Sequence, residues 1–297
     1  MTEKNASFVN DSLKFTNAQR AEVLTQALPL MQRYNGKVVV IKYGGNAMID
    51  DVIKQQVMSD IVLMSLVGVL VVLVHGGGPE ISDLMKRLGK EAVFVDGLRV
   101  TDEETVEIAQ MVLAGKVNKT LVNLLEQHGG QAMGISGLDG RMILAEVRDP
   151  RLGLVGEIVD VNIQPVLDLL DNGYIPVIST LASDAEGNTL NINGDTAAAA
   201  IAGALGAERL LMMTDIDGVL LDKHNPDTLI PEISLDEARD LVKSDIVSGG
   251  MVPKLECCIS AITQGVKSVT IMDGRVPHSL LMELFTDEGA GTMVRGS

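Results

Sequence analysis

The fold is decided by the stretch Val38-Val39-Val40-Ile41-Lys42-Tyr43-Gly44-Gly45-Asn46. Its four successive β-branched residues predict a strand that is buried on both faces, as in a parallel sheet. A lysine and a glycine pair follow at the carboxyl end of this strand, where ligands bind in open α/β sheets. Because glycines leave backbone N–H groups accessible, Lys42, Gly44 and Gly45 are predicted to present positive charge and hydrogen-bond donors to an anion.

A second glycine-rich turn follows the next predicted strand, residues 69–74. The turn reads His75-Gly76-Gly77-Gly78-Pro79 and leads into a predicted helix over residues 80–88, whose first turn suits a proline. Helix N-termini attract anions, so two such turns in one β-α-β unit predict an anion site more specifically than one turn does. His75 is interpreted as a packing residue at the strand end, without a role in proton transfer.

The later segments continue to alternate between strand and helix signals. Further strands are predicted over residues 174–179, 210–213, 266–272 and 292–295, and further helices over residues 50–67, 116–128, 164–170, 197–205, 231–242, 248–263 and 278–284, with another helix beginning at Thr101 or Asp102. Residues 131–136, 141–147 and 155–161 are interpreted as antiparallel strands, which suggests a hairpin lid over a substrate pocket. No linker rich in Pro, Gly or Ser divides the chain, so we expect two lobes of one sheet with a crevice between them.

The N-terminal segment differs from the rest. Residues 1 to about 15 are predicted to be disordered, and Thr16 or Asn17 is expected to cap a helix that ends near Arg33. Apolar residues recur along this helix at helical spacing, and Pro29 is expected to kink it. Two interpretations stay open: the helix packs on its own domain, or it is an arm that pairs with another subunit.

Composition excludes several classes of protein. A formal charge of -16 opposes binding to a nucleic-acid backbone, and an aromatic content of 2% without tryptophan argues against stacking on single strands. The two cysteines, Cys257 and Cys258, are adjacent, which makes a disulfide between them or a metal site improbable and fits a reducing cytoplasm. Neither a signal peptide nor an apolar run of transmembrane length is apparent.

The charged residues near the remaining glycines predict phosphoryl transfer. The chain contains neither a Walker P-loop motif nor G-x-G-x-x-G after the first strand, and the absence of G-x-S-x-G argues against an esterase. Asp195 stands at or near the N-cap of a helix, and Lys254 follows Gly249-Gly250 at the start of another. Phosphoryl transfer requires lysines and backbone N–H groups around the phosphate, and an aspartate between two lysines would organise them.

Six motifs then identify a resemblance. In order they are V-V-I-K-Y-G-G-N-A, V-H-G-G-G-P-x-I, G-L-R-V-T, N-I-N-G-D, T-D-I-D-G-V and G-G-M-V-P-K, and together they resemble the amino acid kinase superfamily, within it the branch that phosphorylates N-acetyl-L-glutamate in arginine biosynthesis. The resemblance covers residues 35–297 and implies a three-layer αβα sandwich with a mainly parallel sheet. It implies an oligomerisation arm over residues 1–34, an N-lobe for acetylglutamate over residues 35–190 and a C-lobe for ATP over residues 191–297.

The resemblance also implies a role for each motif. Lys42 and Lys254 would neutralise the transferred phosphoryl group, and Asp195 would hold both lysines. The acetylglutamate site would contain Gly44, Gly76, Gly77, Arg99 and Asn191. The ATP site would contain Lys42, Gly44, Gly45, Thr214, Asp215, Gly218 and Lys254, with Mg²⁺ carried by ATP and no metal ion held by the protein itself.

The N-terminal helix and the C-terminal stretch resemble the arginine-inhibited, hexameric members of that branch. The resemblance implies a trimer of dimers, L-arginine as a feedback inhibitor and an arginine site with His278, Glu283 and Gly289, and it leaves open a nitrogen-signalling protein as a further partner. Two alternatives remain: another carboxylate or carbamate kinase of this fold, and a non-catalytic protein that senses arginine or nucleotide.

Overall fold

The computed structural model describes residues 15–48, 50–222, 225–244, 246–247 and 249–296. Eight strands form one central sheet in the order β12-β14-β13-β11-β1-β2-β8-β5. All neighbours from β13 to β5 run parallel, whereas β14 runs antiparallel to β13, so the sheet is mainly parallel as predicted. The bounds are β1 (Val38–Tyr43), β2 (Leu70–His75), β5 (Ala132–Ser136), β8 (Ile175–Ser179), β11 (Arg209–Thr214), β12 (Glu232–Ser234), β13 (Ser268–Asp273) and β14 (Gly291–Arg295).

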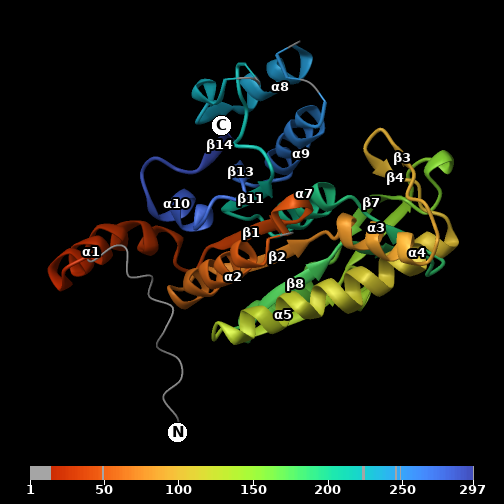
Figure 1. Cartoon of the computed structure of the whole chain (residues 1–297), viewed down its shortest axis with the longest axis horizontal. Helices are drawn as coiled ribbons and strands as arrows, with labels where there is room; N and C mark the ends of the chain where they lie inside the picture. The colour runs from red at the N-terminus through yellow and green to blue at the C-terminus, as the bar shows by residue number, and fades with distance from the viewer. Residues whose placement is uncertain (1–14, 49, 223–224, 245, 248, 297) are drawn as a thin grey trace, which may run out of the picture.

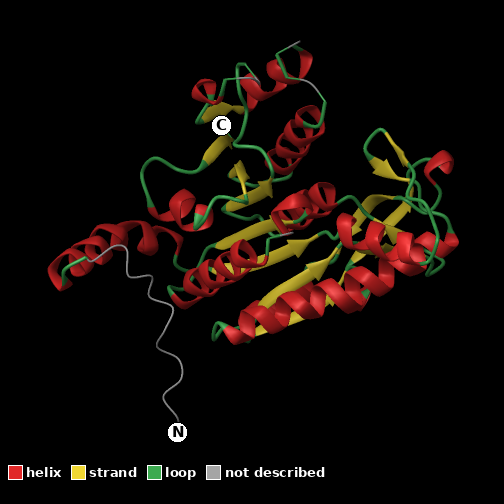
Figure 2. Cartoon of the chain, viewed as in Figure 1, coloured by secondary structure: helices red, strands yellow, loops and turns green. Residues whose placement is uncertain are grey.

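Helices cover both faces of this sheet (Figures 1 and 2). Val39, Ile41 and Tyr43 of β1 belong to a hydrophobic core shared with α2 (Asp51–Leu66), α3 (Gly78–Arg87), α5 (Asn118–Gln127) and α10 (Ser279–Phe285). Val40 belongs to a second core shared with α6 (Gln164–Asp171), α7 (Gly194–Ala204), α8 (Leu235–Lys243) and α9 (Met251–Thr263). Successive residues of a strand point to opposite faces, so this division confirms the predicted three-layer αβα sandwich.

Two predicted helices have different bounds in the structure. The predicted helix 231–242 begins only at Leu235, because residues 232–234 form β12 and the Ser234 side chain caps α8 in a capping box with Glu237. The helix capped by Asp102, α4 (Glu103–Gln110), continues through a wider π-helical segment (Met111–Val117) into α5. The sequence therefore predicted the two α-helical parts but not the π-helical segment that joins them.

The segment 131–161 was interpreted wrongly in part. β5 is not antiparallel; it pairs in parallel with β8 at the edge of the central sheet. The other two predicted strands, β6 (Ile143–Val147) and β7 (Gly156–Val161), do pair antiparallel, and they join β9 (Leu181–Ser183) and β10 (Thr189–Asn191) in a second sheet. A hairpin that was not predicted, β3 (Phe94–Val95) with β4 (Leu98–Arg99), contributes to the cavity described below.

Helix α1 (Asn17–Tyr34) begins at the predicted cap, since the Thr16 side chain accepts a hydrogen bond from the Gln19 N–H. The helix reaches out from the body of the molecule beside α10 (Figure 1). Its C-terminal half packs on the core through Leu30 and Met31, whereas Leu24 and Leu28 are exposed. The disorder predicted for the N-terminus concerns residues 1–14, which lie outside the described residues.

No helix within the described ranges combines the length and the apolar character that a membrane span requires.

Candidate active site

Lys42 lies near the carboxyl end of β1 and is 9% exposed. It shares the face of Val40, the face that α7 covers, so its side chain points toward the start of α7. The stem of Lys42 passes close to two glycines: a Cβ atom on Gly194 would come 3.4 Å from the lysine Cε, and one on Gly44 would come 3.6 Å from it. The lysine stem therefore lies within van der Waals reach of both glycines.

Asp195 lies in the first turn of α7 and does not cap the helix. The cap is Asn193, whose side-chain oxygen accepts hydrogen bonds from the backbone N–H groups of Asp195 and Thr196 at 2.9 and 3.2 Å. The interpretation of Asp195 as a cap is therefore wrong. Because Asn193 already satisfies the helix terminus, the carboxylate of Asp195 is available to other partners.

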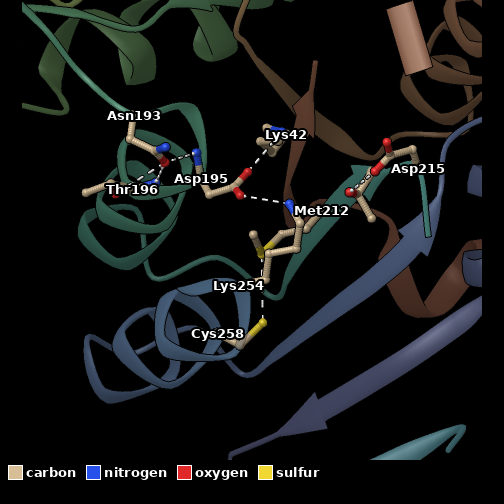
Figure 3. Close-up of polar contacts among 9 residues, drawn as sticks. Lys42, Asn193, Asp195, Thr196, Met212, Asp215, Lys254 and Cys258 are labelled. Carbon is tan, nitrogen blue, oxygen red and sulfur yellow. Dashed lines mark hydrogen bonds and ion pairs between the residues drawn. The ribbon is translucent and has the colours of Figure 1, made fainter. Parts of the chain in front are cut away.

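The carboxylate of Asp195 lies between two lysines that are far apart in the sequence (Figure 3). One oxygen is 2.9 Å from Nζ of Lys42, and the other accepts a hydrogen bond of 3.0 Å from Nζ of Lys254, in the first turns of α9. Beneath them, the Cys258 thiol packs against the Met212 sulfur at 3.8 Å. The structure thus brings together the two lysines and the aspartate that the sequence predicted as one group.

The charges in this group keep Asp195 ionised. Burial by itself raises the pKa of this carboxyl, but the charges of Lys42 and Lys254 outweigh burial and lower the pKa to about 2. With one carboxylate between two ammonium groups, the group carries net positive charge. A phosphate that enters the crevice would therefore meet a positively charged group with little freedom to move.

The two glycine-rich turns lie against each other at the ends of β1 and β2. The Gly76 N–H donates a 3.0 Å hydrogen bond to the Tyr43 carbonyl, so it is not available to a ligand, contrary to the expectation that Gly76 donates to one. In the described part of the chain, the N–H groups of Gly77 and Gly78 donate to no backbone carbonyl. Gly45 has φ of +66°, a conformation that favours glycine.

A cavity of about 150 Å³ opens beside the second turn. It is lined by the glycine turn, the β3–β4 hairpin and the segment before α7, including Arg99 and Asn191. Arg99 is 7% exposed and donates to the Gly78 carbonyl and to the Ser82 hydroxyl, both at 2.8 Å, with its guanidinium 4.7 Å from the centre of the Phe94 ring. These contacts hold Arg99 beside the open N-terminus of α3, at the wall of the cavity.

The residues predicted for the nucleotide follow β11. Thr214 ends the strand, and its hydroxyl lies 3.3 Å from the Asp215 carboxylate. The Asp215 carbonyl accepts a hydrogen bond of 2.7 Å from Arg275, which also binds Asp273 at the end of β13. Gly218 has no room for a side chain, since a Cβ atom there would come 2.5 Å from the Thr292 hydroxyl. This loop is therefore tied to the end of β13 through Arg275 and packs closely against β14 at Gly218.

Of the three residues predicted for an arginine site, Glu283 and Gly289 lie together, whereas His278 binds a residue of another helix. The carboxylate of Glu283 is buried and binds the guanidinium of Arg209, and it also accepts a hydrogen bond of 2.8 Å from the Ala290 N–H. Gly289 is beside it, because a Cβ atom on Gly289 would come 3.0 Å from Glu283 Oε2. His278 faces another partner, Asp60 of α2, with Nδ1 2.7 Å from the carboxylate.

Several residues of the site were missed. Asn193 is a good helix cap by type, but Asp195 two residues later is an equally good one, so the motif alone did not distinguish them. Ser82 and the Gly78 carbonyl, which hold Arg99, have no sequence signal. Among the described residues, no group of three or more His, Cys, Asp and Glu side chains could hold a metal ion.

Comparison with known proteins identifies relatives along most of the chain. Residues 37–273 match the model of the amino acid kinase family. Acetylglutamate kinase of Clostridium kluyveri is 52% identical over 276 residues, which cover 92% of this chain and 98% of the relative. Acetylglutamate kinase of a Nostoc species is 50% identical over 292 residues, which cover 97% of this chain and 98% of the relative.

Solved structures give a consistent result. N-acetylglutamate synthase from Neisseria gonorrhoeae, complexed with coenzyme A and N-acetyl-glutamate, matches with a TM-score of 0.82 and 28% identity. The match covers 93% of this chain and 63% of the synthase chain, so this chain spans less than two thirds of the synthase. The same synthase has been solved with coenzyme A and L-arginine, and that structure matches over 93% of this chain and 65% of the synthase with a TM-score of 0.78 and 25% identity.

Proposed function

The chain belongs to the acetylglutamate kinases of the amino acid kinase family, and from this premise we propose that it transfers the γ-phosphoryl group of ATP to the side-chain carboxylate of N-acetyl-L-glutamate. The products would be ADP and N-acetyl-L-glutamyl 5-phosphate. The observation that carries the proposal is the Asp195 carboxylate held between Lys42 and Lys254 at 2.9 and 3.0 Å.

The acceptor determines which chemistry the protein must supply. A side-chain carboxylate is ionised at neutral pH, so it attacks phosphorus without losing a proton and needs no general base. What opposes the reaction is negative charge, because an anionic acceptor must approach an anionic triphosphate. Catalysis then consists of bringing the two anions together and neutralising the charge between them.

Lys42 and Lys254 are suited to that neutralisation. Each ammonium group has three N–H donors, and the hydrogen bond to Asp195 uses one, so each lysine keeps donors for phosphoryl oxygens. Asp195 fixes the position of both lysines and reduces the repulsion between them. The lysines therefore meet the transferred group without the cost of ordering two flexible side chains during the reaction.

The cavity beside the second glycine turn is the proposed acetylglutamate site. The guanidinium of Arg99 and the amide of Asn191 would bind the polar ends of the substrate, and the free N–H groups of Gly77 and Gly78 would donate to its reacting carboxylate. Since the Gly76 N–H is already donated to Tyr43, we assign to Gly76 only the absence of a side chain that would obstruct the crevice.

The nucleotide is proposed to bind at the ends of β1 and β11. Gly44 and Gly45 would donate to the phosphates, and the loop with Thr214, Asp215 and Gly218 would lie beside the nucleotide. Mg²⁺ would enter as part of the substrate MgATP and would reduce the charge of the triphosphate.

An assay of ADP formation with and without N-acetyl-L-glutamate tests the proposed function. We expect ATP consumption to depend on acetylglutamate and to be much weaker with glutamate, aspartate or carbamate, because a site built for one acid discriminates among anions. A preference for carbamate or another carboxylate in this panel would assign the chain to a different reaction of the same fold. Binding of ATP or arginine without turnover would make it a sensor.

We propose further that L-arginine inhibits this enzyme through the region around Glu283. Because the Glu283 carboxylate already binds the guanidinium of Arg209, the inhibitor would bind beside this pair, in the region where α1 contacts α10. The related synthase binds L-arginine, and α1 with its exposed Leu24 and Leu28 is available for pairing with the same helix of another subunit. The proposed assembly is a hexamer made of three dimers.

Deleting residues 1–33 separates these regulatory proposals from the catalytic one. We expect the shortened chain to form dimers that keep acetylglutamate-dependent turnover but no longer respond to arginine. Hexamers after the deletion, measured by light scattering, would contradict the role of α1 in assembly, and unchanged inhibition would contradict its role in regulation.

The proposed location is the cytoplasm. Both cysteines of the chain, Cys257 and Cys258, are free thiols, and burial raises the pKa of Cys257 to about 11 and so keeps it unreactive. Fractionation of cells that make the protein would test this location.

A further inference from the structure

His75 ends β2 and directly precedes the glycine turn, and its side chain is fully buried. β2 lies between β1 and β8 in the sheet (Figure 1), and His75 shares the face of Val71 and Leu73, which belong to the core shared with α2 and α5. A buried imidazole must find partners for both ring nitrogens. These two partners lie on opposite sides, one in the turn and one on helix α5.

The partner on α5 determines which nitrogen carries the proton. Nε2 of His75 lies 3.1 Å from the amide nitrogen of Asn118, which is also fully buried. The same amide nitrogen donates to the Val177 carbonyl at 2.8 Å and lies 3.2 Å from the Ile135 carbonyl, and the amide oxygen accepts from Lys119 at 2.9 Å. The amide is therefore oriented with its NH₂ group toward His75. Because an amide NH₂ group donates hydrogen bonds and does not accept them, Nε2 of His75 is the acceptor in this contact.

The partner in the turn follows from this tautomer. With Nε2 as an acceptor, the neutral ring carries its proton on Nδ1, which lies 2.9 Å from the Gly76 carbonyl and donates to it. Burial lowers the pKa of His75 to about 4. The hydrogen bond to Gly76 raises the pKa and the charge of Lys119 lowers it further, but burial has the largest effect. The ring therefore stays neutral at physiological pH.

The orientation of the Gly76 carbonyl fixes the next N–H group. The peptide between Gly76 and Gly77 is planar and trans, so the Gly77 N–H points away from the Gly76 carbonyl. Because that carbonyl faces the buried imidazole, the Gly77 N–H faces the cavity lined by the turn, Arg99 and Asn191. Glycine residues without side chains would not hold this orientation by themselves.

We propose that His75 is a positioning residue for phosphoryl transfer: its Nδ1–H holds the Gly76–Gly77 peptide so that the Gly77 N–H donates to the reacting anion. Asn118 selects the required tautomer from the other side of the ring. The inference rests on the proposed function, in which the reacting groups meet beside this turn, and it assigns a part in catalysis to a buried residue that does not touch the substrate.

Two substitutions separate the two hydrogen bonds of the ring. In His75→Asn the amide nitrogen lies near the position of Nδ1 and still donates to Gly76, whereas the contact with Asn118 is lost. In His75→Gln the amide reaches the position of Nε2 and keeps the Asn118 contact, whereas the donor to Gly76 is lost. We expect His75→Gln to lower kcat about tenfold to a hundredfold, which is less than the roughly hundredfold to thousandfold loss caused by removing an oxyanion donor, because the Gly77 N–H is misplaced and not removed. We expect His75→Asn to retain kcat within about fivefold, because the donor to Gly76 is kept.

The controls distinguish this role from a structural one. Both variants are compared at equal folded fraction, and His128→Gln, which changes an exposed histidine at the other end of α5, should leave kcat unchanged. If His75 only stabilised the fold, kcat per folded molecule would be unchanged in both variants. Wild-type kcat in folded His75→Gln, or an equal loss in His75→Asn, would overturn the proposal.

The tautomer is measured independently of activity. In ¹⁵N-histidine-labelled protein at pH 7, the signals of His75, assigned among the four histidines by their loss in His75→Asn, should be those of a neutral ring protonated on Nδ1. A ring protonated on Nε2 would overturn the proposal. This measurement needs no substrate, so it tests the hydrogen bonds of His75 separately from the proposed function. If the ring carries its proton on Nδ1 but the protein shows no acetylglutamate-dependent turnover, the proposed function is wrong and the hydrogen-bond arrangement is right.

Discussion

Two carboxylates of this molecule each bind cations, Asp195 with a side chain 16% exposed and Glu283 with one 4% exposed, and they lie at opposite ends of the strands of the central sheet. Asp195 binds two lysines beside the carboxyl end of β1, whereas Glu283 binds the guanidinium of Arg209 at the start of β11. β1 and β11 are parallel neighbours, so the two clusters belong to the same pair of strands. They differ in whether the cations are enclosed by other protein groups or face a crevice.

The cation at Glu283 is enclosed by protein groups, although its Nε–H has no hydrogen-bond partner among the described residues. Arg209 also donates to the Tyr34 hydroxyl at 2.7 Å and to the Thr270 hydroxyl at 2.9 Å, and the Glu283 side chain is only 4% exposed. This cluster connects α1, β11, β13 and α10. The lysines at Asp195 keep unused donors and face a crevice. The comparison teaches that the same kind of ion pair can hold elements together or hold charge ready for a ligand, depending on whether the cations are enclosed by the protein or face a crevice.

The largest expected effect is on turnover when a lysine of the crevice is replaced. Lys42→Met should lower kcat by about a thousandfold or more, because a positive charge that neutralises the transferred phosphoryl group is lost. Stability should change little, since the apolar stem still packs in the same place. The measurement is ADP formation at saturating substrates with circular dichroism and chemical unfolding of both proteins.

The matched control is Lys37→Met. Lys37 is exposed and directly precedes the same strand, so it should retain the kcat of the wild-type protein. Near-normal turnover in Lys42→Met would contradict the division between a catalytic and a structural cluster.

The second prediction reverses this pattern at Glu283. Glu283→Ala leaves the guanidinium of Arg209 buried without its counter-ion, which should lower the free energy of unfolding by about 3–5 kcal/mol. The kcat of the remaining folded enzyme should stay within a few-fold of wild type. Urea unfolding and the acetylglutamate assay below the unfolding transition measure the two quantities separately.

A double substitution sharpens this result. Arg209→Met with Glu283→Leu removes both charges, so it should recover much of the stability lost in the single variant. If the double variant is as unstable as Glu283→Ala, or if the single variant is stable but inactive, Glu283 does not have the structural role inferred here.

The third prediction concerns acid. Asp195 has a pKa of about 2 in the folded protein, against 3.8 for an aspartate without such partners. Because the folded pKa is the lower one, the ionised carboxylate stabilises the fold above about pH 4, and this contribution is lost as the pH falls toward 2. It is on the order of 2 kcal/mol. The difference in unfolding free energy between the wild-type protein and Asp195→Asn should therefore shrink between pH 5 and pH 3; a constant difference would mean that Asp195 is not coupled to the lysines.

The sequence predicted one of these two clusters and missed the other for a physical reason. Lys42 and Lys254 stand next to glycine-rich turns, so the local sequence marks them as ligand-facing. Arg209 opens a strand with no such marker, and its partner Glu283 is 74 residues away. No local sequence feature distinguishes a buried arginine from a surface one. Glu283 was singled out only through the family resemblance, which implied an L-arginine site at this residue, and in the structure its carboxylate binds Arg209.

Strand partners show the same limit. The sequence predicted β5 as a strand, but whether it pairs with β8 or with β6 depends on contacts across the fold. The run of four β-branched residues in β1, in contrast, is local, and it correctly predicted a strand with a core on each face.

The smallest expected effect comes from a carboxylate–cation pair that has neither burial nor a crevice. Glu232 and Arg295 are 2.8 Å apart on the edge strand β12 and its neighbour β14, with side chains 47% and 55% exposed. Water solvates both partners, so Glu232→Gln should change the unfolding free energy by less than about 1 kcal/mol and leave kcat unchanged. Raising the salt concentration should reduce even this difference, because exposed charges are screened, whereas the loss caused by Glu283→Ala should persist. A loss of several kcal/mol in Glu232→Gln would mean that the distance between two charges, and not their burial, determines how much an ion pair stabilises this protein. The contrast between Asp195 and Glu283 would then need another explanation.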